Sequence, residues 1–368
     1  MIPLLIPLSM ANIILYLAFE RLRILLQLTP TPSYSILWDM THQATALAHP
    51  NIAFIKYWGL RDVTDRIPAN DSLSMIIGGL STRTTVTLDS SLKADVLVLN
   101  GQQATGASLT RAQQFMDRIR RLAGNRTYTL IESENNFPIG AGVASSASGF
   151  AALALAGTAA FGLALPEPAL SSLARFGSGS ACRSIPGGFV EWRTDPETGD
   201  SYATSFAPAD HWDLVDCVAV LSEKHKTTGS EAGMRLAGTS PLQAARVADA
   251  PRRMRLCREA LLNRDFDTFA AITELDSNLM HAVMMTSEPP LFYWQPESLA
   301  IMQAVKRWQV DGLPVTYTLD AGPNVHVICR QEALSEVLSR LRQMPGLIDV
   351  LKGFPAGPAR LLTDDSQD

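Results

Sequence analysis

The stretch PIGAGVASSASG, residues 138–149, lies between a strand-like segment and an alanine-rich segment of helical character. Its two glycines, at positions 140 and 142, allow backbone N–H groups to approach an anion, and the amino end of the following helix adds a positive dipole. Its serine hydroxyls can donate to phosphate or hold magnesium. The stretch therefore predicts a site for a nucleoside triphosphate, and a Gly/Ser turn before a tightly packed helix is the alternative. It lacks the GxxxxGKS/T spacing of a Walker loop.

Strand-like and helix-like segments follow one another outward from this stretch. Residues 82–88 and 94–99 alternate apolar and polar side chains with the period of two that is typical of half-buried strands, and we expect them to pair as a hairpin. Further strands are predicted at 127–131, 189–192, 214–221, 315–319 and 324–329, and helices at 111–122, 146–161, 242–262, 266–284, 296–308 and 331–344.

These segments are mixed without a regular βαβ repeat or an internal sequence period. That order favours an α+β architecture in two lobes over a doubly wound parallel sheet. We place the boundary near Gly187. The predicted domains are residues 41–187 and 188–368, preceded by a hydrophobic extension, residues 1–40, outside the fold.

A second loop, GSGSACRS at residues 177–184, again places hydroxyls and backbone donors beside an arginine. The planar guanidinium of Arg183 suits a carboxylate or a phosphate, so the loop predicts a second anion site. Two such loops in one chain indicate two phosphorylated ligands. A solvated linker with an ordinary surface arginine is the alternative.

A third segment, TYTLDAGPN at residues 316–324, places Asp320 at the end of a strand in a tight Gly-Pro turn. Aspartate in such a turn usually caps backbone amides. A carboxylate fixed at a strand end beside a phosphate loop can instead act as a base toward a hydroxyl. The residues alone leave both readings open.

The charge balance limits the classes of ligand. The 368 residues carry 31 basic and 36 acidic side chains, for a formal net charge of -5, and no long run of Lys and Arg. Neither a nucleic-acid surface nor one for anionic membranes is indicated, so any anionic ligand must be held locally.

The cysteines and histidines do not show the spacing of a metal site. Four cysteines stand far apart with no CxxC pair, which predicts small buried apolar groups in a reducing cytoplasm rather than zinc ligands or disulfides. His225, His281 and His326 stand on different predicted elements, so we expect polar packing or a lining of the site.

Residues 2–19 are almost entirely apolar and are followed by a charged segment and a proline-rich stretch. About 18 apolar residues is the short end of a membrane span. Three readings compete: a membrane anchor, an uncleaved signal-like segment, or residues upstream of a true start at Met40. We favour the last because the globular pattern begins just after Met40. We therefore expect a cytoplasmic protein, without membrane attachment unless residues 2–19 are a real anchor.

Taken together, these segments resemble the diphosphomevalonate decarboxylases of the GHMP kinase superfamily. The motifs NIAFIKYWG (51–59), NNFPIGAGVASSASG (135–149), GSGSACRS (177–184) and LDAGPN (319–324) occur in the family's order. The likeness runs from Ala46 to about Leu351. It implies a GHMP kinase-like two-lobed α+β fold, with a ribosomal protein S5 domain 2-like N-terminal lobe that binds ATP and an α/β C-terminal lobe. It also makes a homodimer the candidate assembly.

The resemblance implies a reaction in two parts. ATP phosphorylates the tertiary 3-hydroxyl of a phosphorylated mevalonate, and the intermediate then loses phosphate and carbon dioxide to give an isopentenyl phosphate. By position in the motifs, Asp320 should orient or deprotonate the hydroxyl, and Lys56 should neutralise charge near it.

The other roles are also carried over by position. The substrate-binding residues implied are Tyr57, Arg111, Ser178, Ser180 and Arg183. Among these, Arg111 should meet the substrate carboxylate, and the two serines with Arg183 should hold its 5-phosphate end. The residues implied for ATP and Mg2+ are Pro138, Gly140, Gly142, Ser145, Ser146 and Ser148, with Ser145 toward the metal. Trp58, in the first motif, should be a core residue or a pocket wall.

Two positions depart from the family's pattern. Leu60 stands where a lysine usually ends the first motif, and Glu231 stands where a basic residue is often found. Both belong to the diphosphate-binding end, and losing a cation while gaining a carboxylate weakens the hold on a doubly phosphorylated tail. We therefore expect mevalonate 5-phosphate as substrate.

Several alternatives stay open. Mevalonate 5-diphosphate is the alternative substrate if Arg61, Lys224, Lys226 or Arg235 compensates for the two departures. A small-molecule kinase of the same superfamily, such as a mevalonate 3-kinase, would be expected to change the pair of Lys56 and Asp320. An inactive paralogue would not turn over ATP.

Overall fold

The computed structural model describes residues 42–137, 145–223 and 228–363. The predicted hydrophobic extension therefore lies outside the described residues. So do the glycine loop with Pro138, Gly140 and Gly142, and the segment that contains Lys224, His225 and Lys226. Of the helices in the described part of the chain, none combines the length and the apolar composition needed to cross a membrane.

The first sheet contains the two strands that were predicted to form a hairpin. Its order is β16-β1-β6-β9-β7-β8, with bounds Arg360–Leu362, Gln43–Ala48, Thr82–Leu88, Thr129–Asn135, Val96–Leu99 and Gln102–Gln103. The hairpin prediction is wrong, because β9 lies between β6 and β7, antiparallel to the first and parallel to the second. Alternation indicates that a strand is half-buried, but it does not identify the partner strand.

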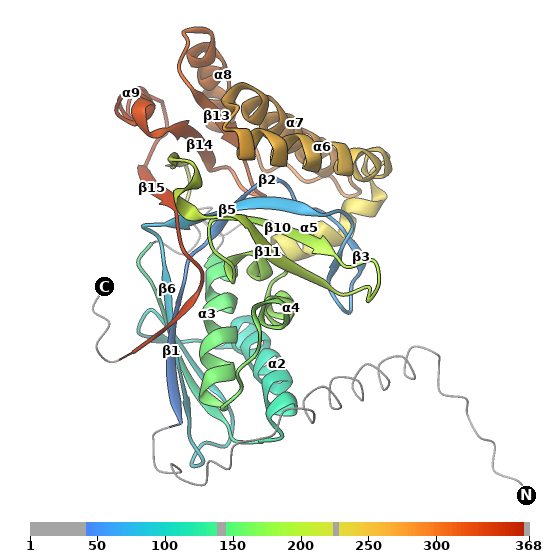
Figure 1. Cartoon of the computed structure of the whole chain (residues 1–368), viewed down its shortest axis with the longest axis vertical. Helices are drawn as coiled ribbons and strands as arrows, with labels where there is room; N and C mark the ends of the chain where they lie inside the picture. The colour runs from blue at the N-terminus through green and yellow to red at the C-terminus, as the bar shows by residue number, and fades with distance from the viewer. Residues whose placement is uncertain (1–41, 138–144, 224–227, 364–368) are drawn as a thin grey trace, which may run out of the picture. The chain divides into compact units, whose positions relative to one another are not determined.

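Helices α2 (Gly106–Ala123) and α3 (Ser145–Ala160) pack on one face of this sheet, and α4 (Glu167–Gly177) packs on them. Figure 1 shows α3 beside β1 and β6, with α2 and α4 beyond it. Helix α3 is built from small residues, so its backbone comes close to its neighbours. A Cβ added at Gly157 would lie 2.7 Å from Ile119 Cδ1 of α2, so a larger residue there would require the Ile119 side chain to shift.

The second sheet joins strands from both halves of the chain. Its order is β11-β10-β5-β15-β12-β14-β13, with β2 paired to β5, and the bounds are Ser201–Ala207, Phe189–Thr194, Ser72–Gly78, Asp349–Pro355, Leu214–Val220, Val325–Arg330, Val315–Thr318 and, for β2, Asn51–Ile55. A two-stranded sheet pairs β3 (Leu60–Asp62) with β4 (Ile67–Pro68). Strands β2 and β5 precede Gly187 and β16 follows it, so both large sheets take strands from each side of the predicted boundary, which stays a prediction.

The remaining helices follow β12 in sequence, and the largest of them lie at the far end of the molecule from α2 and α3 (Figure 1). Their bounds are α5 Ser230–Leu236, α6 Gln243–Asn263, α7 Phe266–Met285, α8 Pro296–Val310 and α9 Leu334–Leu341. A short 3₁₀ helix, Gln331–Ala333, precedes α9, so the single helix predicted at 331–344 is divided and shorter. The α+β architecture predicted from the sequence is confirmed.

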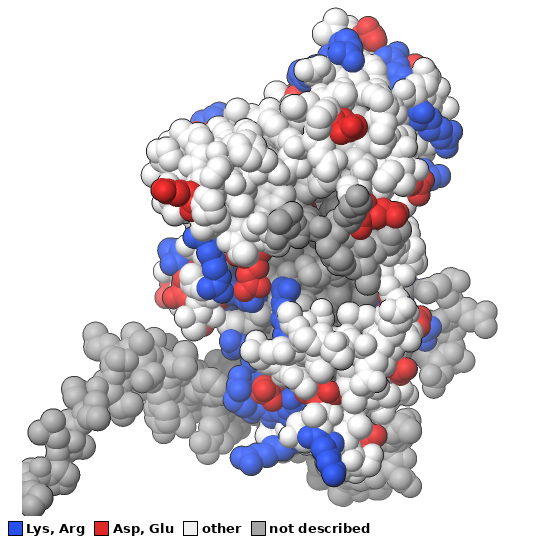
Figure 2. Space-filling model, turned by 180° about the vertical axis from the view of Figure 1, so that it is seen from behind, with Lys and Arg blue, Asp and Glu red and all other residues white. Residues whose placement is uncertain are grey.

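The surface agrees with the small net charge. On the face in Figure 2, basic and acidic side chains are interspersed, and no large area has one sign of charge. All four cysteines are buried with free thiols, as the prediction of small buried groups required.

The core beneath β2 depends on aromatic packing against α7. Phe54 of β2 meets Phe269 of α7 edge to face, with ring centroids 4.8 Å apart and planes at 89°. Both side chains are fully buried. This contact fixes α7 against the strand that leads to Lys56.

We expect Phe269→Ala to lower the free energy of unfolding by about 3–5 kcal/mol, because it removes a buried ring and leaves a cavity. Urea denaturation followed by circular dichroism measures this change. Phe292→Ala is the control, since that side chain is 74% exposed and its loss should cost about 0.5 kcal/mol or less. Equal effects of the two substitutions would contradict the proposed packing.

Candidate active site

An ion pair between Lys56 and Asp320 forms the centre of the site. Lys56 follows β2 and Asp320 lies two residues after β13, so the pair joins positions 264 apart in the chain. The Lys56 Nζ and the Asp320 Oδ1 are 2.7 Å apart. The lysine side chain is 1% exposed and the aspartate 33%, so the carboxylate forms the accessible side of the pair.

Lys56 and Asp320 each shift the pKa of the other. Burial lowers the pKa of the Lys56 ammonium below its usual 10.5, and the carboxylates of Asp320 and Asp276 offset this only in part. Burial would raise the pKa of Asp320, but the charge and hydrogen bond of Lys56, together with the charges of His326 and Arg183, outweigh it and bring the pKa down to about 2. A carboxylate that holds its proton so weakly is better suited to orient a hydroxyl than to deprotonate it by itself.

The segment predicted as a second anion loop is a 3₁₀ helix, η1 (Gly179–Ser184), directly after α4. The alternative of a solvated linker with a surface arginine is wrong, because Arg183 is buried. Its Nε donates to Asn51 Oδ1 at 3.0 Å and its Nη1 to Ser72 Oγ at 2.8 Å. Asn51 is a residue that the sequence analysis missed. Its place at the start of the first motif was the available signal.

Tyr57 packs closely on η1. Its ring meets Trp192 at 4.6 Å between centroids, and a Cβ added at Gly179 would lie 2.6 Å from its Cε1. Glycine at 179 is therefore what admits the tyrosine ring. Burial raises the pKa of the phenol, so its hydroxyl remains a hydrogen-bond donor, and Arg66, Arg183 and Glu231 are all near enough to influence it.

The two predicted anion-binding segments meet in space. Ser146 Oγ, in the first turn of α3, lies 3.3 Å from Ser178 Oγ, which in turn lies 3.5 Å from Ser180 Oγ. The first turn of α3 contains no acidic residue. Three hydroxyls and a helix amino end thus gather at one place, a combination that suits phosphate oxygens.

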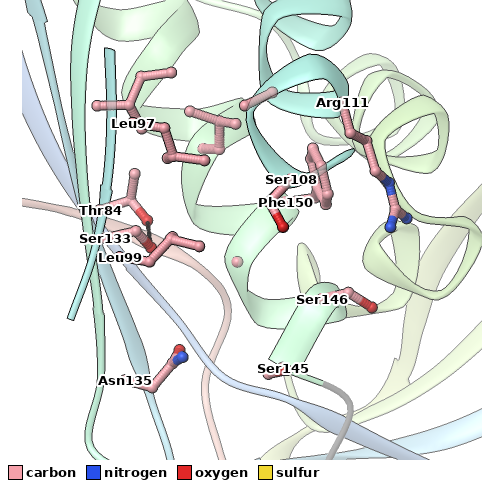
Figure 3. A pocket seen from close by; sticks show the side chains of 14 residues that line it. Thr84, Leu97, Leu99, Ser108, Arg111, Ser133, Asn135, Ser145, Ser146 and Phe150 are labelled. Atoms are coloured by element: carbon pink, nitrogen blue, oxygen red, sulfur yellow. Dashed lines mark hydrogen bonds between the residues drawn. The ribbon is translucent and has the colours of Figure 1, made fainter. Parts of the chain in front are cut away.

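A pocket of about 220 Å³ opens beside these hydroxyls. It lies between the first sheet and helices α2 and α3, and Figure 3 shows its lining. Leu97, Leu99 and Phe150 form apolar walls, while Ser145 and Ser146 stand at its lower end. Apolar walls with a few polar groups are typical of sites for flat organic ligands.

Arg111, on α2, also lines this pocket. Its Nε donates to the Gly177 carbonyl at 2.8 Å and its guanidinium lies 4.9 Å from the Phe150 ring centroid. Burial lowers its pKa, and the charge of Arg66 adds to that effect. The structure therefore places Arg111 between the pocket and the end of α4.

Ser148 is not brought to the site. It is fully buried, and its hydroxyl lies 2.6 Å from Thr82 Oγ1 of β6. Its side chain holds α3 against the sheet instead of facing a ligand. Pro138, Gly140 and Gly142 lie outside the described residues, so their predicted contacts with ATP stay predictions.

Glu231, one of the two departures from the family's pattern, is surrounded by arginines. Its Oε1 accepts from Arg66 Nη2 at 3.0 Å and lies 3.5 Å from Arg235 Nη2. Burial favours its protonated form, but Arg66 and Arg111 outweigh this and lower its pKa. Arg66 was missed because the turn between β3 and β4, where its φ is 52°, has no sequence signal that points to the site. Leu60 is half-buried.

The two described histidines of the sequence analysis are buried, and both lie near enough to Asp320 to act on it or feel its charge. His281 stacks on Trp294 with centroids 4.8 Å apart, and burial lowers its pKa to about 3, so it is neutral. His326 Nδ1 lies 2.7 Å from Asp216 Oδ2. Trp58 is buried in an apolar cluster with Met280, as predicted for a core residue.

Two family models together match most of the described chain. Residues 48–203 match the diphosphomevalonate decarboxylase-like N-terminal domain, and residues 217–360 match the mevalonate 5-diphosphate decarboxylase C-terminal domain.

Individual proteins give the same result. The diphosphomevalonate decarboxylase of Ganoderma lucidum is 40% identical over 322 residues, which cover 81% of this chain and 80% of that protein. The crystal structure of mevalonate diphosphate decarboxylase from Staphylococcus aureus is 34% identical, with a TM-score of 0.83 over 89% of this chain and all of that one. A structure of MDDEF in complex with MVAPP, AMPPCP and magnesium is 35% identical, with a TM-score of 0.81 over 87% and 98% of the two chains.

Proposed function

The chain belongs to the diphosphomevalonate decarboxylase family of the GHMP kinase superfamily, which are ATP-dependent carboxy-lyases, and we propose that its substrate is mevalonate 5-diphosphate. The proposed products are isopentenyl diphosphate, carbon dioxide, phosphate and ADP. The observation that supports the decarboxylase activity most directly is the ion pair of Lys56 and Asp320, which brings an ionised carboxylate and an ammonium together. The names of the relatives support the diphosphate.

Asp320 and Lys56 serve the 3-hydroxyl in this proposal. The accessible Asp320 carboxylate accepts the hydroxyl proton in a hydrogen bond and aims its oxygen at the γ-phosphate of ATP, while the Lys56 ammonium balances charge on the transferring group. The new 3-phosphate is a much better leaving group than hydroxide. Its departure takes the electron pair of the C–O bond, and the carboxylate's C–C bond supplies the electrons for the double bond as carbon dioxide leaves.

The pocket beside α3 suits ATP. Its apolar walls would take the adenosine end, and the phosphates would then lie at the amino end of α3 with Ser145 and Ser146. Ser148 is left out of this assignment because its hydroxyl is bonded to Thr82. Mg2+ bound to the ATP phosphates keeps several waters and needs few protein ligands, so the hydroxyl of Ser145 suffices as a contact.

The opposite end of the substrate would meet η1. Ser178 and Ser180 offer hydroxyls, and the buried Arg183 and the Tyr57 hydroxyl offer donors for the 5-phosphate. Arg111 is the proposed partner of the substrate carboxylate. A GHMP-type division into an N-terminal and a C-terminal lobe near Gly187, a homodimer and a cytoplasmic location also stay proposals.

Mevalonate 5-phosphate is a second candidate substrate, and one contact favours it. Glu231 pairs with Arg66 at 3.0 Å, and both charges are near enough to Tyr57 to influence its hydroxyl. A second phosphate would have to displace this carboxylate or accept its repulsion. Leu60 supplies no cation to compensate.

The test is ATP-dependent carbon dioxide release from mevalonate, its 5-phosphate and its 5-diphosphate, measured side by side with the purified protein. We expect kcat/KM for the diphosphate to exceed that for the monophosphate by about tenfold or more, since one added charge-assisted contact contributes about 1.5–3 kcal/mol. The reverse order would establish the second candidate. No release from any of the three would overturn the decarboxylase proposal.

Asp320→Asn should lower kcat by at least about 100-fold, because the neutral amide oxygen is a weaker acceptor for the hydroxyl and no longer forms an ion pair with Lys56. The Kd of ATP, measured by calorimetry, should change less than about threefold, which also shows that the variant is folded. Asp213→Asn, an exposed aspartate before β12, is the control. Decarboxylation by Asp320→Asn at the normal rate would refute the role given to Asp320.

Glu231→Gln should lower the KM for mevalonate 5-diphosphate by about tenfold, because it frees the Arg66 guanidinium for the second phosphate. The KM for the monophosphate should change much less. Glu332→Gln removes the same charge from an exposed glutamate paired with Arg330, and it should leave both KM values unchanged. If the diphosphate KM does not respond to Glu231→Gln, the ion pair has no part in substrate choice.

A further inference from the structure

Two consecutive residues of α7, Asp276 and Ser277, touch the two strands that end in the catalytic pair. Both are fully buried. The sequence analysis gave them no role. Neither lies on the strands that hold Lys56 and Asp320, so their contacts reach across from a third element.

Asp276 holds the backbone of Lys56 itself. Its Oδ1 accepts the Lys56 N–H at 2.7 Å, and its Oδ2 accepts from Arg253 Nε of α6, also at 2.7 Å. Arg253 is fully buried as well. The Asp276 carboxylate is thus held in place by the Arg253 guanidinium and in turn holds the backbone N–H of Lys56. Hydrogen bonds to charged groups are about twice as strong as those between neutral groups.

The backbone carbonyl of Lys56 is also hydrogen-bonded, to donors on other elements. It accepts from Arg246 Nη2 of α6 at 2.8 Å and from Asn70 Nδ2 at 3.0 Å. Arg246 also donates to Asn70 Oδ1 at 3.1 Å, so the two donors support each other. With both its N–H and its C=O bonded to buried side chains, the Lys56 backbone cannot shift without breaking several of these bonds.

Ser277 makes the matching contact on the other strand. Its Oγ accepts the N–H of Leu319 at 3.0 Å, and Leu319 directly precedes Asp320. Because Asp276 and Ser277 are adjacent in one helix, the spacing between the Lys56 and Leu319 backbones is set by a single rigid turn of α7. That spacing determines how the two catalytic side chains meet at 2.7 Å.

We propose that Asp276 and Ser277 are positioning residues that hold the Lys56 ammonium and the Asp320 carboxylate in their working geometry. The proposal rests on the function proposed above for that pair. It adds that the geometry is imposed from α7, because consecutive side chains of that helix bind the backbone at both ends of the pair. A displacement of about 1 Å at a reacting group can cost about 100-fold in rate.

Asp276 also acts on Lys56 through its charge. It is one of the carboxylates that hold the lysine pKa up against the effect of burial. Removing the charge while keeping the shape should therefore lower the Lys56 pKa further. The ammonium would then lose its proton at a lower pH, and the fall of kcat at alkaline pH would begin earlier.

The competing explanation is that both residues only stabilise the packing of α7. Thr273, one turn earlier and also fully buried, provides the matched control, since it lies beside Cys257 of α6. Thr273→Val removes a buried hydroxyl from the same helix without altering a hydrogen bond to either catalytic strand.

The experiment measures kcat and KM from neutral to alkaline pH for Asp276→Asn, Ser277→Ala and Thr273→Val in the full chain. We expect kcat to fall about 10-fold in Ser277→Ala and about 100-fold in Asp276→Asn, with KM within about threefold. The alkaline limb should move to lower pH in Asp276→Asn only. Thr273→Val should match the wild type within about twofold.

A second measurement needs no turnover. Titration of the Lys56 Nζ by NMR in protein labelled with 15N-lysine should give a lower pKa in Asp276→Asn than in the wild type. An unchanged Lys56 pKa, or an unchanged kcat in folded Ser277→Ala, would overturn the proposal. Failure of the wild type to release carbon dioxide would instead refute the proposed function, and the titration would still decide whether Asp276 acts on Lys56. If Asp276→Asn does not fold, Ser277→Ala supplies the test.

Discussion

The buried ammonium of Lys56 needs a charged partner, and it forms an ion pair with Asp320. Much of the architecture brings these two residues together. A lysine that is 1% exposed has lost its hydration, which is costly unless a carboxylate replaces the water. The partner is 264 positions away, so β2 and β13 must end at the same place. The shared second sheet and the contacts of α7 with both strand ends meet this condition.

A second constraint is the gathering of anion-binding groups in a chain with a net charge of -5. In the proposed function, phosphate is held through local donors instead of a basic surface. The amino end of α3 and the start of η1 bring Ser146, Ser178 and Ser180 together. Buried Arg183 is kept in place by Asn51 and Ser72, and water screens its charge little.

The surroundings of Glu231 show how one charge can offset another. The charges of Arg66 and Arg111 lower the pKa of Glu231, and its carboxylate in turn offsets part of their positive charge. In the proposed function, the number of phosphates that the site prefers depends on this balance of charges. The sequence identified the acidic member of this balance but not Arg66, because nothing in the order of residues shows that a turn after β3 approaches α5.

The sequence by itself determined the period of most strands and helices and the α+β class. It also determined the motifs that contain Lys56, Arg183 and Asp320. These features depend only on residues that are close together in the chain. The tertiary structure alone decided which strands pair. It placed β9 between β6 and β7, where alternation had indicated a hairpin. It also directed the Ser148 side chain into the core, and it formed the ion pair between Arg66 and Glu231. Above all, it set Asp276 and Ser277 against the backbone of Lys56 and Leu319, since hydrogen bonds between residues more than 40 positions apart depend on packing that no single segment specifies.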